Sequence, residues 1–201
     1  FITGATGFIG SYLVSKFLSL GHEVLALRRT SESLPKINFE TQPKWLEGDI
    51  ENLNSNDLKG VNVIVHLAAT GISPKEASWT DLERINIGGT LRICKLAKHL
   101  GARLICAGSY AEYGLSGLRY DFIPIDAPLE PTFSYAASKA AAGLMAISFS
   151  RVEKIEYAHL RIFNAYGEGQ YKNNLWPSLK NAAEKGLDFS LTLGEQVRDF
   201  I

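Results

Sequence analysis

Three residues carry the strongest chemical signal in this sequence: Tyr135, Lys139 and an upstream serine, Ser109. Four places apart on a helix, Tyr135 and Lys139 lie on one face, one turn from each other. An adjacent ammonium stabilises a phenolate, so Lys139 is expected to lower the Tyr135 pKa from about 10 toward neutrality. Ser109 is then expected to polarise the substrate oxygen with which Tyr135 exchanges a proton. A tyrosine and a lysine with this spacing also often occupy an exposed helix face.

A glycine turn at the start of the chain predicts a site for a pyrophosphate. Gly4 permits a tight turn, Gly7 lets the backbone approach the phosphates, and Gly10 lets the following helix pack against the strand. The helix N-terminus offers free N–H groups and a partial positive charge. The expected contacts of this turn are Gly4, Thr6, Gly7, Phe8, Ile9 and Gly10. An ordinary glycine-rich strand, turn and helix is the alternative interpretation.

Two arginines follow the second expected strand, where NAD-preferring sites carry an acidic residue. A guanidinium suits a 2′-phosphate, so this position predicts NADP, with NAD as the alternative. Arg28 is expected to bind the phosphate, and Arg29 to stack on the adenine. The opposing interpretation is that both arginines are solvated loop residues.

Two further segments are expected at the cofactor face. One follows the third expected strand and the other ends the fourth, and their candidate contacts are Asp49, Ile50, Leu67, Ala68 and Ala69. His66 precedes the second segment. It has neither the partner nor the spacing of a metal ligand or general base, so we expect a structural histidine with satisfied hydrogen bonds.

Composition excludes several classes of protein. Among 201 residues, 21 Lys and Arg balance 21 Asp and Glu, which leaves no basic surplus for nucleic acid or anionic lipid. No apolar run approaches the roughly 20 residues that span a bilayer. We therefore expect no nucleic acid or membrane partner and a cytoplasmic location. Cys94 and Cys106 lack the spacing of a metal site, so no metal is expected and both are interpreted as buried thiols.

Short apolar runs alternate with amphipathic segments of helix length along the chain. This pattern predicts an α/β fold, a Rossmann-like doubly wound parallel sheet with helices on both faces and strand order 3-2-1-4-5-6. The expected strands are 1–3, 23–27, 44–47, 61–67, 103–107 and 157–162. The expected helices are 10–20, 82–100, 135–151 and about 177–185.

The sequence changes in character after residue 165. Residues 1–165 are expected to form the dinucleotide-binding domain with the catalytic triad. Residues 166–201, richer in glycine, asparagine and tryptophan, are expected to begin a smaller C-terminal substrate-binding region. Because the chain starts at Phe1 and stops within an apolar run, we expect it to be a fragment.

Together, these motifs resemble the extended short-chain dehydrogenase/reductase family, also called the NAD-dependent epimerase/dehydratase family. The resemblance runs almost end to end. Besides the glycine turn, the segments near Asp49 and His66 and the three residues described first, it includes Asn86, Asn164 and Arg198.

The resemblance implies roles for these residues. Ser109, Tyr135 and Lys139 match the family's catalytic triad, in which the lysine also holds the nicotinamide ribose. Asn86 matches an asparagine that supports the site, with a purely structural cap role as the alternative. Asn164 and Arg198 match residues that contact the diphosphate of a sugar nucleotide, which suits an amide donor and a guanidinium.

One departure narrows the expected reaction. Dehydratases of the family carry an acidic pair directly after the catalytic serine or threonine, whereas Tyr110 and Ala111 follow Ser109, and Glu112 comes one place too late. The segments around Glu112 and Trp176 look similar to reductases of 4-keto-6-deoxy sugar nucleotides. We therefore expect an NAD(P)-dependent reductase of an NDP-4-keto-6-deoxyhexose. An epimerase that keeps its cofactor bound is one alternative, and a non-enzymatic dinucleotide sensor is a distant one.

A homodimer is also expected. The helices over 82–100 and 135–151 carry small and apolar residues beyond a single core-facing stripe, and family members pair through the matching helices. Ala140, Ala141, Ala142 and Gly143 would permit close packing. Ordinary packing within one subunit is the alternative.

Overall fold

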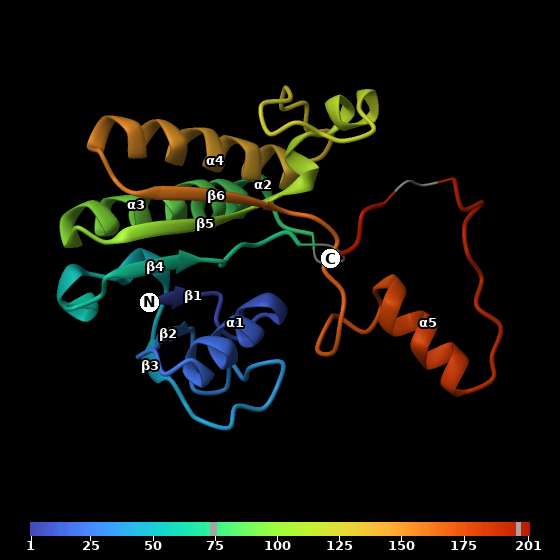
Figure 1. Ribbon diagram of the computed structural model, residues 1–201, viewed down its shortest axis with the longest axis horizontal. Helices are drawn as coiled ribbons and strands as arrows, with labels where there is room; N and C mark the ends of the chain where they lie inside the picture. The colour runs from blue at the N-terminus through green and yellow to red at the C-terminus, as the bar shows by residue number, and fades with distance from the viewer. Residues whose placement is uncertain (73–75, 196–197) are drawn as a thin grey trace.

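Six parallel strands form the central sheet of the computed structural model, which describes residues 1–72, 76–195 and 198–201. The strands are β1 Ile2–Thr3, β2 Leu25–Arg28, β3 Lys44–Glu47, β4 Val63–His66, β5 Arg103–Ser109 and β6 Tyr157–Ile162. They lie in the order β3-β2-β1-β4-β5-β6, with every neighbouring pair parallel (Figure 1). This confirms the predicted fold class and strand order.

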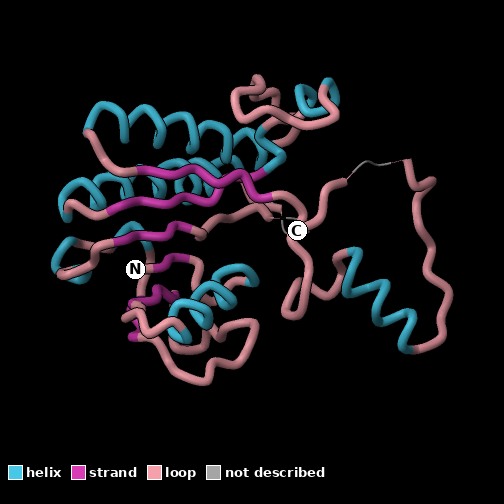
Figure 2. Tube along the Cα trace, viewed as in Figure 1, coloured by secondary structure: helices cyan, strands magenta, loops and turns pink. Residues whose placement is uncertain are grey.

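Helices cover both faces of the sheet (Figure 2). Helix α1, Phe8–Ser19, packs on one face, and α3, Gly89–Leu100, and α4, Ser134–Glu153, pack on the other. The remaining helices are the short α2, Trp79–Asp81, and α5, Leu175–Glu184. Two hydrophobic clusters divide the core. Ile64 of β4 packs in the cluster that contains α3 and α4 residues, whereas its neighbour Val65 packs in the cluster that contains Val14 of α1. Successive strand residues thus point to opposite faces, as a sheet buried on both sides requires.

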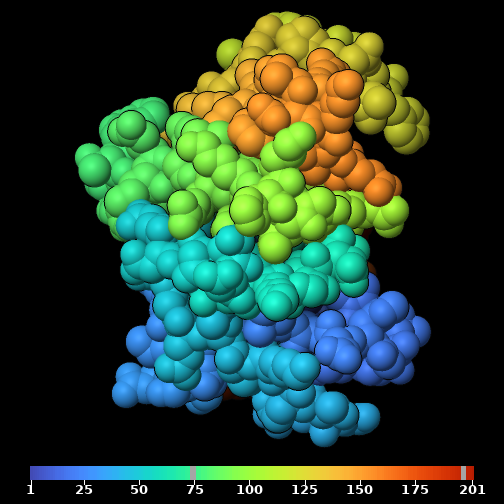
Figure 3. Space-filling model, turned by 90° about the vertical axis from the view of Figure 1, so that its left-hand side faces the viewer, coloured from blue at the N-terminus to red at the C-terminus, as the bar shows by residue number. Residues whose placement is uncertain are grey.

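Figure 3, a view from the side, shows the two edges of the sheet at opposite ends of the molecule. The blue N-terminal segments lie at the bottom of this view and the orange segments around the start of β6 lie at the top. The glycine turn, the segment Leu67 to Ala69 and Ser109 lie at the ends of β1, β4 and β5, which are central in the sheet order. These candidates are therefore held by strands with neighbours on both sides.

The expected helix over 82–100 is split in the structure. A π-helical segment, η3, covers Leu82–Gly88, and regular α-helix begins only at Gly89. Asn86 is buried inside this wider turn, with its side chain bonded to other parts of the fold. The π turn follows no periodicity that a search for helical spacing would detect.

Helix α4 packs mainly inside the subunit. Ala140, Ala142 and Gly143 are buried there, whereas Ala141 is exposed. Most of the small residues expected at a dimer interface therefore pack α4 against its own sheet and neighbouring helices. The exposed apolar residues of α4 include Leu144.

The chain leaves the sheet after β6. Helix α5 and the surrounding loops stand apart from the layered part of the molecule in Figure 1, and an isolated parallel bridge between Asn164 and Phe200 returns the chain end to the sheet edge. The division expected at residue 165 remains a prediction. Among residues 1–72, 76–195 and 198–201, no helix is both long and apolar enough to cross a membrane.

His66 has the structural role that the sequence predicts. Its ring nitrogens lie 2.7 Å from the Thr3 hydroxyl and 3.2 Å from the Thr90 hydroxyl. Thr90 donates its own proton to the Asn86 carbonyl, so it accepts from His66, and Thr3 donates to the other nitrogen of a neutral ring. Burial, together with the positive charge of Lys139, lowers the pKa of His66 to about 3.

This depressed pKa predicts acid sensitivity of the fold. As pH falls from about 6.5 toward 3, the unfolded chain takes up a proton at His66 that the folded chain does not, so the free energy of unfolding falls by about 1.4 kcal/mol per pH unit. Urea unfolding between pH 7 and 4 should show a shallower loss of stability in His66→Gln than in the wild type. His99→Gln, at an exposed site on α3, is the control and should keep the wild-type slope. Equal slopes in all three proteins would contradict the assignment.

Candidate active site

The predicted functional residues gather at the carboxyl ends of the central strands. The glycine turn follows β1, Leu67 to Ala69 follow β4, and Ser109 ends β5. In an open parallel sheet these ends meet at one edge, where ligands bind. Helix α4 brings Tyr135 and Lys139 to the end of β5 in its first turns.

The glycine turn forms a cradle that side chains would fill. A Cβ atom on Gly4, whose φ is +68°, would lie 2.8 Å from the Ala68 nitrogen, and one on Gly10 would lie 2.1 Å from the Gly4 carbonyl oxygen. Helix α1 begins after Gly7 with no side-chain cap and no acidic residue in its first turn. Its first N–H groups are therefore open to an anionic ligand, and the residues present fit the pyrophosphate of a dinucleotide.

Ser109, Tyr135 and Lys139 come together in the structure. Ser109 and Lys139 are buried, Tyr135 is half-buried, and the Ser109 and Tyr135 side chains share a hydrogen bond. Lys139 donates from Nζ to the Ala107 carbonyl oxygen of β5 at 2.7 Å. A phenol, a hydroxyl and an ammonium at one sheet edge can bind a carbonyl or hydroxyl oxygen and move a proton to or from it.

The pKa of Tyr135 differs from the expectation. Burial raises it to about 12, and the negative charge of Glu112 acts in the same direction, whereas the hydrogen bond with Ser109 lowers it. Lys139 is not among the groups that shift the Tyr135 pKa, and its ammonium donates to a backbone carbonyl. Burial lowers the pKa of Lys139, and the nearby Glu112 charge opposes that change. In this structure Tyr135 is a protonated phenol at neutral pH.

Asn86 supports the site from behind. Its amide nitrogen donates to the Ser138 hydroxyl at 2.8 Å and to the Thr70 carbonyl at 3.1 Å, and its oxygen accepts from the Thr70 N–H at 2.8 Å. These bonds join the loop after β4 to helix α4. The choice between support of the site and a purely structural role remains a prediction.

Arg28 is engaged within the protein. Its guanidinium lies 2.7 Å from the Glu47 carboxylate and 5.0 Å from the centre of the Trp45 ring, and the arginine side chain is only 19% exposed. A 2′-phosphate would have to compete with the Glu47 carboxylate for this guanidinium, and binding of the phosphate by Arg28 remains a prediction. Arg29 is exposed.

The remaining cofactor candidates differ in exposure. Leu67, Ala68 and Ala69 are half-buried, with the backbone of the first two directly against Gly4. Asp49 is exposed, and Ile50 packs against the core beneath α3. In the turn after β1, Thr6 and Phe8 are half-buried and Ile9 is exposed. Their contacts with a cofactor remain predictions.

The two predicted substrate residues, far apart in the sequence, are brought near each other by the fold. Asn164 donates from its side chain to the Asp199 carbonyl at 3.0 Å, next to Arg198, which is exposed. The bridge between Asn164 and Phe200 thus brings both candidates to the same edge of the sheet. Their binding of a diphosphate remains a prediction.

The sequence reasoning does not find the buried cluster that Glu112 forms with two other residues beneath the site. Glu112 is fully buried and accepts hydrogen bonds from His159 at 3.1 Å and from Arg161 at 2.9 Å. Its carboxylate lies inside the core. Two signals point to this cluster: the capping-box spacing Ser-x-x-Glu from Ser109, and polar residues at alternate positions of β6.

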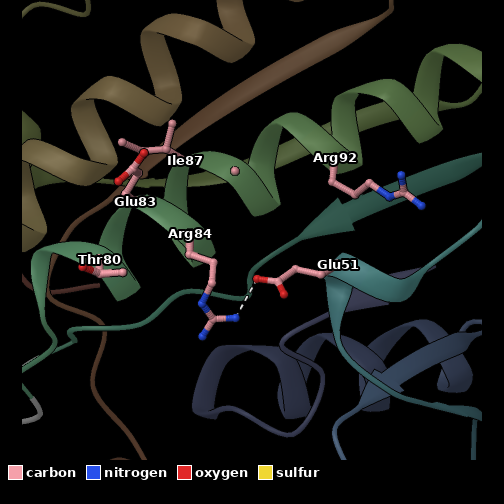
Figure 4. A pocket seen from close by; sticks show the side chains of 7 residues that line it. Glu51, Thr80, Glu83, Arg84, Ile87 and Arg92 are labelled. Carbon is pink, nitrogen blue, oxygen red and sulfur yellow. Dashed lines mark hydrogen bonds and ion pairs between the residues drawn. The ribbon is translucent and has the colours of Figure 1, made fainter.

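A surface cavity of about 580 Å³ lies elsewhere, between the turn after β3 and the start of α3 (Figure 4). Its lining is Glu51, Thr80, Glu83, Arg84, Ile87, Gly88 and Arg92. Arg84 and Glu51 form a 2.6 Å ion pair there. None of the predicted site residues lines this cavity, so it does not contribute to the candidate site.

Comparisons with known proteins show to which family and to which solved structures the chain is similar. The sequence pattern of the family described as "NAD dependent epimerase/dehydratase family" matches residues 1–201. UDP-glucuronic acid decarboxylase 1 of Danio rerio is 30% identical over 188 residues, which cover 86% of this chain and 43% of the relative. A putative UDP-glucose 4-epimerase of Methanocaldococcus jannaschii is 27% identical, with 100% of this chain and 68% of the relative covered.

A solved structure of similar architecture is MoeE5 in complex with UDP-glucose and NAD. It is 32% identical, with a TM-score of 0.80, and the match covers 99% of this chain and 66% of MoeE5. The chain thus spans under half the length of the fish decarboxylase and about two thirds of MoeE5.

Proposed function

The chain belongs to the NAD dependent epimerase/dehydratase family, and from this premise we propose that it transfers hydride between a nicotinamide dinucleotide and a ring carbon of a sugar nucleotide. The observation that carries the proposal is the meeting of Ser109, Tyr135 and Lys139 at the sheet edge that holds the glycine cradle. MoeE5, which was solved with UDP-glucose and NAD, supports both ligand classes.

Each of the three side chains has a separate role at the sugar oxygen that gains or loses the proton. A bound nicotinamide ring supplies or accepts the hydride. Tyr135 supplies the proton that a carbonyl oxygen takes up when its carbon is reduced, and Ser109 hydrogen-bonds the same oxygen. The Lys139 ammonium provides positive charge behind Tyr135 and, as the family resemblance implies, holds the nicotinamide ribose.

Within this class we propose reduction of the C4 ketone of an NDP-4-keto-6-deoxyhexose. With a pKa raised to about 12, Tyr135 is protonated at neutral pH and suited to donate. Glu112 is buried in a network with His159 and Arg161, so it is not free to expel a hydroxyl group as a dehydratase acid does. An epimerase is the second candidate, since one of the relatives is a putative UDP-glucose 4-epimerase.

A cofactor assay separates the candidates. The protein is incubated with NADH or NADPH and a dTDP-linked 4-keto-6-deoxyhexose, and absorbance at about 340 nm is followed. A reductase oxidises one equivalent of cofactor per sugar. An epimerase instead interconverts UDP-glucose and UDP-galactose with no net change in absorbance. Absence of both reactions and of sugar-nucleotide binding by the full-length protein would overturn the proposal.

Tyr135→Phe tests the proton donor. The change removes only the phenolic oxygen, so turnover of the active sugar nucleotide should fall by about 100- to 10,000-fold. Cofactor affinity, measured by calorimetry, should stay within a few-fold of the wild type. Lys139→Ala should weaken both turnover and cofactor binding, because its proposed role is double. Near-normal turnover of Tyr135→Phe would show that another group supplies the proton.

For the cofactor we propose NADP binding through Arg28, with NAD as the alternative that the MoeE5 complex supports. A 2′-phosphate binds Arg28 only if it displaces the Glu47 carboxylate from the guanidinium or shares the guanidinium with it. The negative charge of Glu47 repels a phosphate at this position. A hydrogen bond to a charged group contributes about 1.5–3 kcal/mol. Glu47 therefore sets how much of this energy is available to NADP.

Calorimetric titration of both cofactors tests this competition. Arg28→Ala should weaken NADP binding by roughly 10- to 150-fold and leave NAD binding nearly unchanged. Glu47→Gln should strengthen NADP binding relative to NAD, because it releases Arg28 from its carboxylate partner. Arg29→Ala, at the exposed neighbouring position, is the matched control and should not change the ratio of the two affinities. A wild type that prefers NAD and stays so in Glu47→Gln would refute the NADP proposal.

We further propose that the intact protein is a homodimer paired through the outer surface of α4, where Ala141, Leu144 and Val152 are exposed. Light scattering of the full-length protein at micromolar concentration should give twice the monomer mass. Charge introduced by Leu144→Glu should return it to a monomer, whereas a monomeric wild type would refute the proposal.

A further inference from the structure

We propose that Glu112 is a positioning residue for the active site, whose buried carboxylate fixes the backbone of Ser109 and sets the charge beneath Tyr135 and Lys139. This inference adds a residue to the site of the proposed function, and it rests on the proposal that this site is catalytic. Its test uses no sugar nucleotide, so the two can fail separately.

The first argument is the direct bond between Glu112 and Ser109. Glu112 accepts the Ser109 backbone N–H at 2.8 Å, and the Ser109 hydroxyl accepts the Ala111 N–H at 3.2 Å. This capping box closes the turn η4, Tyr110–Glu112, at the end of β5. Because Ser109 ends the strand, this carboxylate holds its N–H and thereby the direction of its side chain.

The second argument is that the carboxylate is kept ionised in the interior. Arg161 donates to it from Nε at 2.9 Å and is itself held by the Tyr113 hydroxyl at 3.2 Å and the Ile125 carbonyl at 3.1 Å. His159 lies 3.1 Å away. These bonds outweigh the effect of burial, and the pKa of Glu112 is lowered.

The ionised carboxylate also orients His159. A carboxylate only accepts, so His159 donates to it from Nε2. The other ring nitrogen lies 2.9 Å from the Tyr157 hydroxyl. The Glu112 carboxylate is thus held from β6 by both His159 and Arg161.

The third argument is the space reserved for the cluster. A Cβ atom on Gly108 would lie 2.6 Å from a Glu112 oxygen, and the corresponding atoms on Gly108 and Gly143 would lie 2.8 Å or less from the His159 ring. A strand of the sheet and the catalytic helix thus both lack side chains where the Glu112 and His159 pair sits. Real Cβ atoms do not approach so closely, so the pair requires both glycines.

The fourth argument is the effect on the catalytic groups. The Glu112 charge raises the pKa of Tyr135 and raises that of Lys139, so it favours a protonated phenol and a charged ammonium. A buried ion pair is often no more stabilising than apolar packing of similar volume. The placement of this pair under the site therefore calls for a role besides holding β5, β6 and α4 together.

Two substitutions separate charge from reach. Glu112→Gln removes the charge and retains the length, whereas Glu112→Asp retains the charge but is one methylene too short to hold the Ser109 N–H together with Arg161 and His159. The matched control is Glu156→Gln, which removes an exposed 2.7 Å ion pair with Arg103 at the far end of β5 and β6. The variants are compared as folded proteins, with circular dichroism to verify folding.

The readouts are the Ser109 amide and the Tyr135 phenol. Hydrogen exchange by NMR should show the Ser109 amide exchanging about tenfold or more faster in Glu112→Asp, the change that loss of roughly 1.4 kcal/mol of hydrogen bonding produces. Ultraviolet difference titration, with Tyr135→Phe subtracted, should show roughly twofold or more ionised Tyr135 near pH 10.5 in Glu112→Gln. Glu112→Asp should titrate like the wild type, and Glu156→Gln should match it in both readouts.

If Glu112 had only a structural role, its substitution would lower the melting temperature and leave the Ser109 exchange rate and the Tyr135 titration unchanged. Wild-type exchange at Ser109 in folded Glu112→Asp, or wild-type titration of Tyr135 in folded Glu112→Gln, would overturn the proposal. If the glutamine variant does not fold, the aspartate variant decides alone, through the exchange of the Ser109 amide.

Discussion

The backbone of helix α1 meets the turn after β1 so closely that no side chain fits between them. A Cβ atom on Gly10 would lie 2.1 Å from the Gly4 carbonyl oxygen, and one on Gly4 would lie 2.8 Å from the Ala68 nitrogen at the end of β4. This contact sets where the helix begins relative to two central strands. The position of the open N–H groups at the start of α1 depends on that placement.

A polar path inside the core extends this constraint to the catalytic helix. From Thr3 it runs through His66 to Thr90, whose hydroxyl donates to the Asn86 carbonyl. The Asn86 side chain donates to the Ser138 hydroxyl, which in turn donates to the carbonyl of Tyr135. The strand before the glycine turn and the start of α4 are thus joined by hydrogen bonds between groups that are largely removed from water.

Sequence patterns identify the sheet order and the chemical groups of the site because these follow from local periodicity and motif spacing. Sequence patterns do not show side-chain pairs that form only when two strands lie side by side in the sheet. Arg28 and Glu47 are register partners on β2 and β3, and this pairing, invisible in the spacing of 19 residues, occupies the guanidinium expected to bind phosphate. The predicted lowering of the Tyr135 pKa was wrong for a similar reason. Burial by the surrounding fold and the charge of Glu112, which lies on another element, both raise it.

The cluster beneath the site has a consequence for how this sequence can change over evolution. A larger residue at Gly108 or Gly143 would displace the His159 ring, and loss of Arg161 would leave the Glu112 carboxylate buried without a balancing cation. Single substitutions at these positions are therefore penalised unless others accompany them. Related chains should keep the glutamate, the arginine, the histidine and both glycines as a set or replace them together, so that the five positions covary although they lie on four separate elements of the fold.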